Sequence, residues 1–558
     1  MDKGAPLLRS PPFPGIDAAV SQGGTVKVSS SLAPQQIDDL FAAIRDAQVG
    51  GCFWAPPAGE TDSRTVIRPK SVDEIGPLLS TLSDAERAAA LWLLPASVAN
   101  RTSIRSLVEP GSALFGEVDP WSLLDRDIRL LAHGDDEWLA LASIADRPLH
   151  ILSSGRFGEP GADGALLRSQ VAQSLSRVRY RNPFTGQDAS IEATIAQLAD
   201  WRRTFEANRN IIAACGFSWW KRQEIARFLW TPRHALHFFR SERQAIRHAT
   251  RRGGAVAVWP SRVSAHMPGA ASAKHVPLIR VEDGFIRSIG LGSNLVPPSS
   301  VAVDRLGIHY DPGGPSDLEA LLAEASFPPS LLARAEQLRH TILAAGISKY
   351  GGDSDHMFPQ RQPQRSLVLV PGQVEDDMSV QLGGGGLSSN LELLRRTRAL
   401  EPDAEIWFRP HPDVDAGHRK GLVRDEDALD FADRIIRGGN MARLLEHIDA
   451  VHVLTSLTGF EALLRGRDVT SHGMPFYSGW GLTRDLAPVP ERRGRQLTLD
   501  QLVAAVLILY PRYLDPVTGL PCPPEVLIQR MSDGAAHNRL GWVTRIRQFQ
   551  GWLMRQLS

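Results

Sequence analysis

The sequence has few cysteines, no long hydrophobic run and no excess charge of either sign. The three cysteines, Cys52, Cys215 and Cys522, are scattered, which excludes a disulfide framework or a cysteine-rich zinc cluster and indicates a reducing compartment. No window approaches the roughly 18 apolar residues that a membrane span requires, and the first residues contain no apolar core like that of a signal peptide. Basic and acidic residues are equal at 62 each, so net charge does not indicate nucleic acid. We therefore expect a cytoplasmic protein that binds no nucleic acid.

The chain is too long for one hydrophobic core and predicts about three to four compact units. Residues 1–200 are expected to form a mixed α/β region, with a helix over 83–94 that begins at a capping serine. In the later chain, apolar strand-like runs alternate with amphipathic helices. This alternation predicts an α/β fold with two doubly wound, Rossmann-type halves that face a cleft, over 201–365 and 366–535. Residues 536–558 are predicted to form a basic amphipathic helix.

The N-terminal region repeats a pattern of the later chain. Residues 121–152 and 442–473 both suggest a short helix, a strand, a turn, a helix and a strand. Either all such units look alike, or the first is a degenerate copy of the second. The acidic turn at residues 134–136 would repel a phosphate where the later segment has Thr455 and Ser456. We therefore expect the N-terminal region to be a non-catalytic module.

A basic stretch follows this region. Between Lys221 and Arg252 there are nine Lys or Arg residues against two acids, Glu224 and Glu242. Such a stretch is typical of a solvated helix face. Because aromatic side chains are interleaved with the arginines, it also suits a surface that meets anionic lipid.

Polar clusters follow four of the predicted strands. Acids and glycines at strand ends are ordinary turn residues, but four clusters in one chain, each after an apolar strand, favour a functional site. Ligands of parallel sheets bind at this edge, outside the carboxyl ends of the strands. The clusters are Arg280 to Ser288, Gln373 to Ser379, Arg409 to Asp413, and Thr455 to Glu461.

Two of the clusters suit a nucleotide. Thr455 and Ser456 precede a predicted helix, whose free N–H groups and positive end suit a phosphate. His411 lies between two prolines and can donate to a phosphate oxygen or protonate a leaving group near neutral pH.

The other two clusters supply paired carboxylates. Glu282 with Asp283, and Asp376 with Asp377, come from opposite halves and suit an oxocarbenium-like centre in glycosyl transfer. A metal ion is the rival explanation. No His or Cys spacing supports a tight metal site, so we expect neither a metal nor another cofactor.

A dense series of motifs extends from about Gly216 to Asp515. It includes RVEDGFIRSIGLGSN, ISKY, VLVPGQVEDDMSV, FRPHPDV, VLTSLTGFEALLRG, PFYSGWGLT and LTLDQLVAAVLILYPRYLDPVTG. These motifs resemble those of the capsule polysaccharide synthesis family, specifically the second catalytic module of its KpsC-type β-Kdo transferases (Kdo is 3-deoxy-D-manno-oct-2-ulosonic acid). The EDG, HP and Ser/Thr clusters are also similar to those of bacterial CMP-sialic acid transferases. The resemblance implies a GT-B-like fold, CMP-β-Kdo as donor substrate and a retaining transfer to a Kdo chain on a phospholipid.

The resemblance also suggests roles for individual residues. Asp377 is expected to be the nucleophile or close ion-pair partner of the reacting carbon, and Asp376 and Glu375 either shape its field or cap the following turn. The catalytic set is Asp377, Asp376, Glu282, Asp283 and His411; the nucleotide-binding set is Gln373, His411, Pro412, Thr455, Ser456, Thr458 and Glu461; the substrate-binding set is Arg280, Gly284, Arg287, Ser288, Lys349 and Arg409.

One departure from the family pattern matters. Members with two active modules carry these clusters twice, whereas each occurs once here. The chain is therefore expected to form one linkage type, or to act beside a partner that forms the other. Three alternatives stay open: a donor with a related keto-acid sugar, a two-Rossmann enzyme that uses a UDP-sugar, and a non-catalytic component of capsule assembly or export.

The implied acceptor is a phospholipid-linked oligo-Kdo chain. The protein is therefore expected to be peripheral on the inner face of the cytoplasmic membrane, beside the capsule assembly and export machinery. Apolar residues recur at helical spacing from Trp542 to Leu557, among arginines. This segment either lies on an anionic membrane surface or packs as a core helix.

Overall fold

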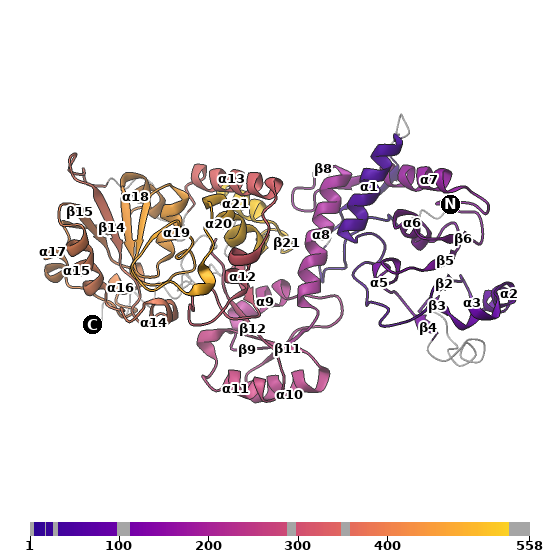
Figure 1. Ribbon diagram of the computed structural model, residues 1–558, viewed down its shortest axis with the longest axis horizontal. Helices are drawn as coiled ribbons and strands as arrows, with labels where there is room; N and C mark the ends of the chain where they lie inside the picture. The colour runs from indigo at the N-terminus through magenta and orange to yellow at the C-terminus, as the bar shows by residue number, and fades with distance from the viewer. Residues whose placement is uncertain are drawn as a thin grey trace. The chain divides into compact units, whose positions relative to one another are not determined.

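The computed structural model (Figure 1) divides the chain into two compact units. The N-terminal unit comprises Met1–Arg209 and Trp230–Ala235, and the C-terminal unit comprises Asn210–Leu229 and Leu236–Ser558. The structure describes residues 5–16, 18–25, 32–96, 112–286, 297–347 and 358–534.

The N-terminal unit contains a five-stranded parallel sheet and a small antiparallel sheet. The parallel sheet has the order β4 (Ala113–Phe115), β3 (Ala90–Leu94), β2 (Thr65–Arg68), β5 (Arg129–Ala132) and β6 (Leu149–Ile151). The small sheet has the order β1 (Ser21–Thr25), β7 (Val178–Arg181) and β8 (Asp188–Ala189). The helices are α1 (Pro34–Ala47), η1 (Val72–Glu74), α2 (Ile75–Thr81), α3 (Asp84–Ala88), α5 (Trp121–Leu124), α6 (Glu137–Ile144), α7 (Gly164–Ser176) and α8 (Ile191–Asn208).

The helix predicted over 83–94 is wrong in its second half. Ser83 does cap α3, in a reciprocal capping box with Glu86, but the helix ends at Ala88. The residues that follow form β3, in which all five side chains are buried. A short apolar run fits a strand covered on both faces as well as it fits a helix, so periodicity alone does not distinguish them.

The C-terminal unit begins with a seven-stranded sheet. Its order is β10 (His237–Phe239), β9 (Ile211–Cys215), β11 (Ala255–Val258), β12 (Leu278–Asp283), β13 (Ser300–Asp304), β20 (Pro511–Leu514) and β21 (Pro521–Cys522), of which the first four are parallel and the last three are antiparallel to their neighbours. Its helices are η2 (Trp219–Lys221), α9 (Arg222–Phe228), α10 (Glu242–Arg252), η3 (Pro260–Arg262), α11 (Met267–Ser272), α12 (Asp317–Glu324) and α13 (Pro329–Ala344). Helix α9 packs in the core on one face of the sheet, and α10 and α11 cover the other face (Figure 1).

The second half of this unit is a six-stranded parallel sheet. Its order is β16 (Arg434–Ile435), β15 (Glu405–Arg409), β14 (Leu367–Pro371), β17 (Ala450–Val453), β18 (Asp468–Ser471) and β19 (Arg484–Asp485). The central strands β14 and β15 are buried at every position, as expected for a parallel sheet covered on both faces. The helices are α14 (Met378–Gly383), α15 (Asn390–Leu400), α16 (Pro412–Asp415), α17 (Asp425–Leu429), α18 (Met441–His447), α19 (Leu457–Leu464), η5 (Glu491–Arg493), α20 (Leu499–Val503), η6 (Ala504–Leu509) and α21 (Pro524–Ser532).

The predicted α/β architecture with two Rossmann-type halves is confirmed, but the boundaries differ. Helix α8 continues to Asn208, so the first unit extends to Arg209 rather than to residue 200. Strands β20 and β21 return to the first sheet, so residues 511–522 belong to the first half and not to the predicted 366–535.

Among the helices of the described residues, none has the length and hydropathy to cross a membrane. The helix predicted over 536–558 lies outside the described residues.

Candidate functional site

The four polar clusters meet at one cavity in the C-terminal unit. The cavity has a volume of about 480 Å³ and is lined by strand ends from both sheets. It therefore lies at the carboxyl edge of the parallel strands, where α/β folds bind ligands. The predicted residues that line it are Glu282, Asp283, Gly284, Gln373, Asp376, Asp377, Arg409, His411, Pro412, Thr455, Ser456 and Thr458.

The end of β17 and the start of α19 form an anion-binding element. Ser456 caps α19, and its Oγ accepts a hydrogen bond of 3.2 Å from the backbone N–H of Thr458. Thr455 is tied to the end of β14 by Gln373, whose Nε2 donates to Thr455 Oγ1 and whose Oε1 accepts from Thr455 N, each at 2.9 Å. The element presents hydroxyl groups at the positive end of a helix and contributes no negative charge, which suits a phosphate.

Asp377 faces the cavity from the loop after β14. It caps α14, where its Oδ1 accepts from the backbone N–H of Ser379 at 3.1 Å and from the Ser379 hydroxyl at 3.3 Å. These bonds fix the carboxylate at the start of α14, where Met378 and Ser379 also line the cavity. Within the described part of the chain, Asp377 forms no ion pair, so its charge is available to a positive centre in the cavity.

The two acids before Asp377 are engaged elsewhere. Asp376 pairs with Arg419 at 3.1 Å, and both side chains are half-exposed. Glu375 accepts a hydrogen bond of 2.8 Å from the backbone N–H of Asn390, at the start of α15, and does not line the cavity. Glu375 therefore supports a helix terminus, although on α15 rather than on the turn that follows it.

The acids at the end of β12 are held by a lysine that the sequence did not single out. Lys221 Nζ lies 3.0 Å from Asp283 Oδ1, with 11% and 16% of the two side chains exposed. The ammonium group also lies 3.5 Å from the ring centroid of Trp259. Glu282 Oε1 accepts a hydrogen bond of 3.1 Å from the backbone N–H of Asp283. The buried ammonium group of Lys221 therefore compensates the charge of Asp283 and orients its carboxylate.

Arg409 presents a buried guanidinium to the cavity. Its side chain lies at the end of β15 and the residue is 8% exposed. One nitrogen, Nη2, donates to the carbonyl of Gly439 at 2.8 Å, whereas Nη1 has no hydrogen-bond partner in the described residues. Burial lowers the pKa of Arg409, and the charge of Glu461 raises it. A buried donor without a partner at the wall of a cavity is suited to an anionic ligand.

His411 is oriented by its own helix. It caps α16, and its Nδ1 accepts a hydrogen bond of 3.2 Å from the backbone N–H of Asp413. The neutral ring therefore carries its proton on Nε2, and the ring lines the cavity beside Pro412. This tautomer can donate to a phosphate oxygen.

Tyr310 is a cavity residue that sequence reasoning missed. Its hydroxyl is buried and has no hydrogen-bond partner in the described structure. Burial raises its pKa, and the charges of Glu282 and Asp377 raise it further. Tyr310 is therefore a neutral donor, and it lies within the field of acids from both halves.

Several predicted residues are not brought to the cavity. Arg280 lies on β12 and donates to the carbonyl of Leu306 at 3.4 Å, and Glu461 is buried within α19. Neither lines the cavity. Arg287, Ser288 and Lys349 lie outside the described residues.

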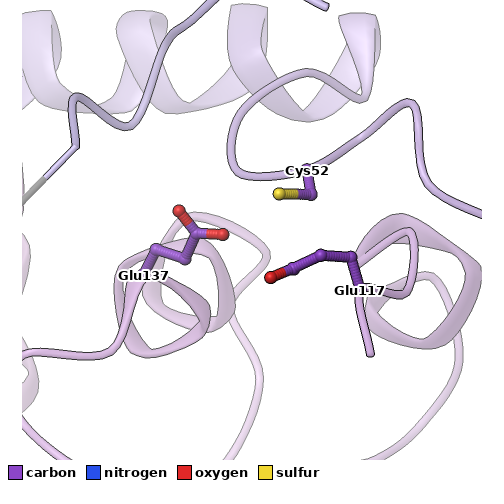
Figure 2. A group of neighbouring side chains, drawn as sticks. All are labelled: Cys52, Glu117 and Glu137. Carbon is purple, nitrogen blue, oxygen red and sulfur yellow. The ribbon is translucent and has the colours of Figure 1, made fainter. Parts of the chain in front are cut away.

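A second group of ligand-type side chains lies in the N-terminal unit. Cys52, Glu117 and Glu137 point toward a common space (Figure 2), with one ligand atom of each within 4.8 Å of the others. Arg9 occupies this group: Nη1 donates to Glu137 at 2.5 Å and Nη2 donates to Cys52 Sγ at 3.0 Å. Burial raises the pKa of Cys52 to about 12, so the thiol stays protonated. A guanidinium, not a metal ion, fits these neighbours.

Two Rossmann-type halves around a cavity with an anion-binding element and acidic loops define an α/β protein of GT-B-like fold. Residues 254–513 match the family model described as "Capsule polysaccharide biosynthesis protein". The chain belongs to this family, and the resemblance found in the sequence is confirmed.

Similar proteins come from several bacteria. The chain is 41% identical over 365 residues to "Capsule polysaccharide modification protein LipA" of Neisseria meningitidis serogroup A / serotype 4A, covering 65% of this chain and 51% of LipA. It is 46% identical over 241 residues to "Lipopolysaccharide-processing protein LpsZ" of Rhizobium meliloti, covering 43% of this chain and 54% of LpsZ. The chain thus spans about half the length of the curated relatives it matches.

A solved structure is also similar. "Thermosulfurimonas dismutans KpsC, beta Kdo 2,4 transferase" is 33% identical, with a TM-score of 0.50, and the match covers 57% of this chain and 98% of the KpsC chain.

Proposed function

We propose that the chain is a retaining glycosyltransferase of capsular polysaccharide synthesis, with CMP-β-Kdo as donor and a phospholipid-linked Kdo chain as acceptor. The observation that carries the proposal is the meeting of an uncharged anion-binding element with carboxylates of both sheets at one cavity. The 33% identity to a KpsC transferase module supports the choice of donor. The enzyme acts at the inner face of the cytoplasmic membrane, beside the capsule assembly and export machinery.

The cavity suits a donor with two anionic groups. The start of α19, with Ser456 and Thr458, accommodates the phosphodiester, and His411 Nε2 donates to one of its oxygens. Arg409 Nη1 comes from a different strand end and is suited to a second anion, the sugar carboxylate. A UDP-hexose lacks that carboxylate and would leave the buried donor of Arg409 unpaired, which costs binding free energy.

The carboxylates suit the transfer step. The bond between the anomeric carbon and the phosphate oxygen breaks, and its electron pair leaves with CMP. Asp377 compensates the positive charge that develops on the sugar and forms a bond to the anomeric carbon. The acceptor hydroxyl then displaces Asp377, and its proton passes to a carboxylate of the Glu282–Asp283 pair. Two displacements at the same carbon retain its configuration.

Donor assays test this function. Purified protein is incubated with CMP-Kdo, CMP-sialic acid or UDP-sugars, with and without a short Kdo acceptor, and CMP or UDP release is measured. We expect release from CMP-Kdo alone, and a product whose new linkage is β by NMR. Turnover of a UDP-sugar instead would refute the donor. Nucleotide binding without turnover of any donor would make the chain a non-catalytic component of capsule assembly.

We further propose that the N-terminal unit is a non-catalytic relative of the six-stranded half. The same order of parallel strands in the two sheets supports this relationship. The acidic turn that begins α6, at Asp135 and Asp136, supports the absence of a phosphate site there.

A further inference from the structure

Helix α10 and the segments on either side of α11 carry many basic side chains. Residues 237–280 contain eight Lys or Arg side chains and a single acid, Glu242. That acid is already engaged, because its carboxylate accepts hydrogen bonds from the backbone N–H of Ser264 at 2.6 Å and from the Ser264 hydroxyl at 2.7 Å. The exposed members of this set form what we name the basic face: Arg240, Arg243, Arg247, Arg251, Arg252, Arg262 and Lys274.

The exposure of the basic face follows from how α10 packs. One side of α10 buries Ala245, Ile246 and Ala249 against the strands of the seven-stranded sheet. Arg243, Arg247 and Arg251 recur at four-residue spacing on the opposite side, and all are exposed. Helix α11 lies beside α10 on the same face of the sheet (Figure 1). The charges therefore lie on the exposed side of α10, in the loop before it and on either side of α11, and none of them lines the described cavity.

Several exposed arginines elsewhere in this unit are paired with acids. On α15, Arg395 and Arg396 pair with Glu392 at 3.1 Å, and Arg424 pairs with Asp427 at 2.9 Å. None of the seven basic-face side chains forms an ion pair with the described residues. Like charges at four-residue spacing destabilise a helix, so this arrangement gains free energy from an anionic partner.

We propose that the basic face binds an anionic phospholipid surface. Four to eight clustered Lys or Arg side chains are enough for electrostatic attachment to such a surface. No large apolar side chain is exposed between residues 237 and 280 of the described structure, so the contact is electrostatic and superficial. A chain-like polyanion is typically held in a groove that follows its backbone, whereas these charges lie on the exposed side of α10 and in adjoining segments, which suits a planar array of headgroups. The proposal goes beyond the transferase function and does not depend on the donor sugar.

Vesicle sedimentation tests the proposal with the full chain. The vesicles are phosphatidylcholine alone, or phosphatidylcholine with roughly a third phosphatidylglycerol. The test variant is Arg243→Gln/Arg247→Gln/Arg251→Gln. The matched control, Arg395→Gln/Arg396→Gln/Arg424→Gln, removes the same number of charges from exposed arginines that are paired. Thermal unfolding of both variants checks that they are folded.

We expect the wild type and the control to bind anionic vesicles at low salt and to be released at high salt, because the interaction is screened. The test variant should bind about 100-fold more weakly, at roughly fivefold per arginine removed. Three results would overturn the proposal: equal binding to neutral vesicles, an equal loss in the control, or wild-type binding by the test variant. Binding to heparin without binding to vesicles would assign the face to a soluble polyanion and would also overturn it.

Discussion

The five-stranded sheet of the N-terminal unit and the six-stranded sheet of the C-terminal unit share one design. In both, the first strand lies in the middle, the next two strands extend the sheet to one side, and the later strands extend it to the other. Thus β2, β3, β4, β5 and β6 correspond in order to β14, β15, β16, β17 and β18, and all pairs are parallel. The similarity of residues 121–152 and 442–473 corresponds to the same elements of the two sheets.

The two sheets differ in the side chains that lie at the carboxyl ends of their strands. In the N-terminal unit, Asp136 caps α6 through a hydrogen bond of 2.9 Å from Trp138 N, and its other oxygen pairs with Arg68 at 2.8 Å. In the C-terminal unit, the cap of α19 is the neutral Ser456, and the neutral side chain of Gln373 binds Thr455 beside it. A carboxylate cap with its own arginine satisfies the helix terminus internally, whereas a hydroxyl cap leaves the positive end of the helix for a ligand. The identity of one capping residue therefore decides whether the helix terminus is compensated within the protein or can bind an anionic ligand.

The similarity extends to a turn that the sequence comparison missed. Asn182 accepts hydrogen bonds from the N–H groups two and three residues later, and Asp515 does the same. Each residue is followed four positions later by a glycine of positive φ, Gly186 at 73° and Gly519 at 74°. Each turn joins two antiparallel strands, β7 to β8 and β20 to β21.

The largest effect is expected from the acid that follows the first strand of the six-stranded sheet. In the five-stranded sheet the acid at the same distance after β2 is Glu74, which lies 3.0 Å from His133, whereas Asp377, after β14, forms no ion pair with the described residues. Asp377→Asn should reduce kcat by about 10³-fold or more while CMP affinity is unchanged, because the amide still caps α14 but cannot compensate positive charge. Single-turnover transfer and CMP titration measure the two quantities. A near-normal rate would remove Asp377 from the mechanism.

The next effect comes from transferring the N-terminal cap to the C-terminal sheet. Ser456→Asp should weaken CMP binding by roughly 100-fold, since an added carboxylate repels the phosphate at short range while still capping α19. Isothermal titration with CMP measures this change, and Ser456→Asn serves as an uncharged control that should lose much less. An equal loss of CMP affinity in the two variants would show that side-chain size, and not charge, weakens the binding.

A smaller effect is expected when the two turns are made alike. Asp515 is fully buried and pairs with Arg530 at 3.0 Å, an ion pair without a counterpart at Asn182. Asp515→Asn should keep the turn but lose this pair, lowering the free energy of unfolding by about 2 kcal/mol. Asp515→Ala should cost more because the turn is lost as well. Urea unfolding followed by circular dichroism distinguishes them, and equal costs would contradict a separate contribution of the ion pair.

The smallest effect concerns pH. In the C-terminal sheet His452 Nδ1 lies 3.1 Å from His472 Nε2, and burial lowers the pKa of His452 to about 3 and that of His472 to about 4. Glu401 is 3.5 Å from His452, too distant to offset burial. The unfolded chain binds protons near pH 6.5 that the folded sheet does not bind, so stability should fall as pH falls below about 7.

This loss should be about 1 kcal/mol between pH 7 and pH 6. In the N-terminal unit the buried His133 has a carboxylate neighbour instead, Glu74 at 3.0 Å. Hydrogen exchange of the backbone amides of β17 and β5, measured at pH 7 and pH 6, compares how the stability of the two sheets depends on pH. The pH dependence of β17 should weaken in His452→Gln, and an unchanged dependence would exclude the histidine pair as its source.

The sequence predicted the strand edge of the site because apolar runs located β14, β15 and β17, and parallel strands must end at one edge. It did not predict Lys221 or Tyr310, because the contact of Lys221 with Asp283 and the position of Tyr310 in the cavity wall both arise from tertiary packing. Arg280 was included because it is close in sequence to Glu282, but two residues along a strand displace a side chain by about 7 Å. The return of β20 to the first sheet was missed because strand pairing over such a separation leaves no local pattern.

That return also has a consequence for synthesis of the protein on the ribosome. Strand β13 ends at Asp304 and its neighbour β20 begins at Pro511, so roughly 200 residues are translated between the two. At about 5–20 residues per second, β13 has an unpaired edge for about 10 to 40 seconds after it emerges. An open strand edge can pair with another nascent chain. During this interval the protein is most exposed to aggregation and has the greatest need of a chaperone.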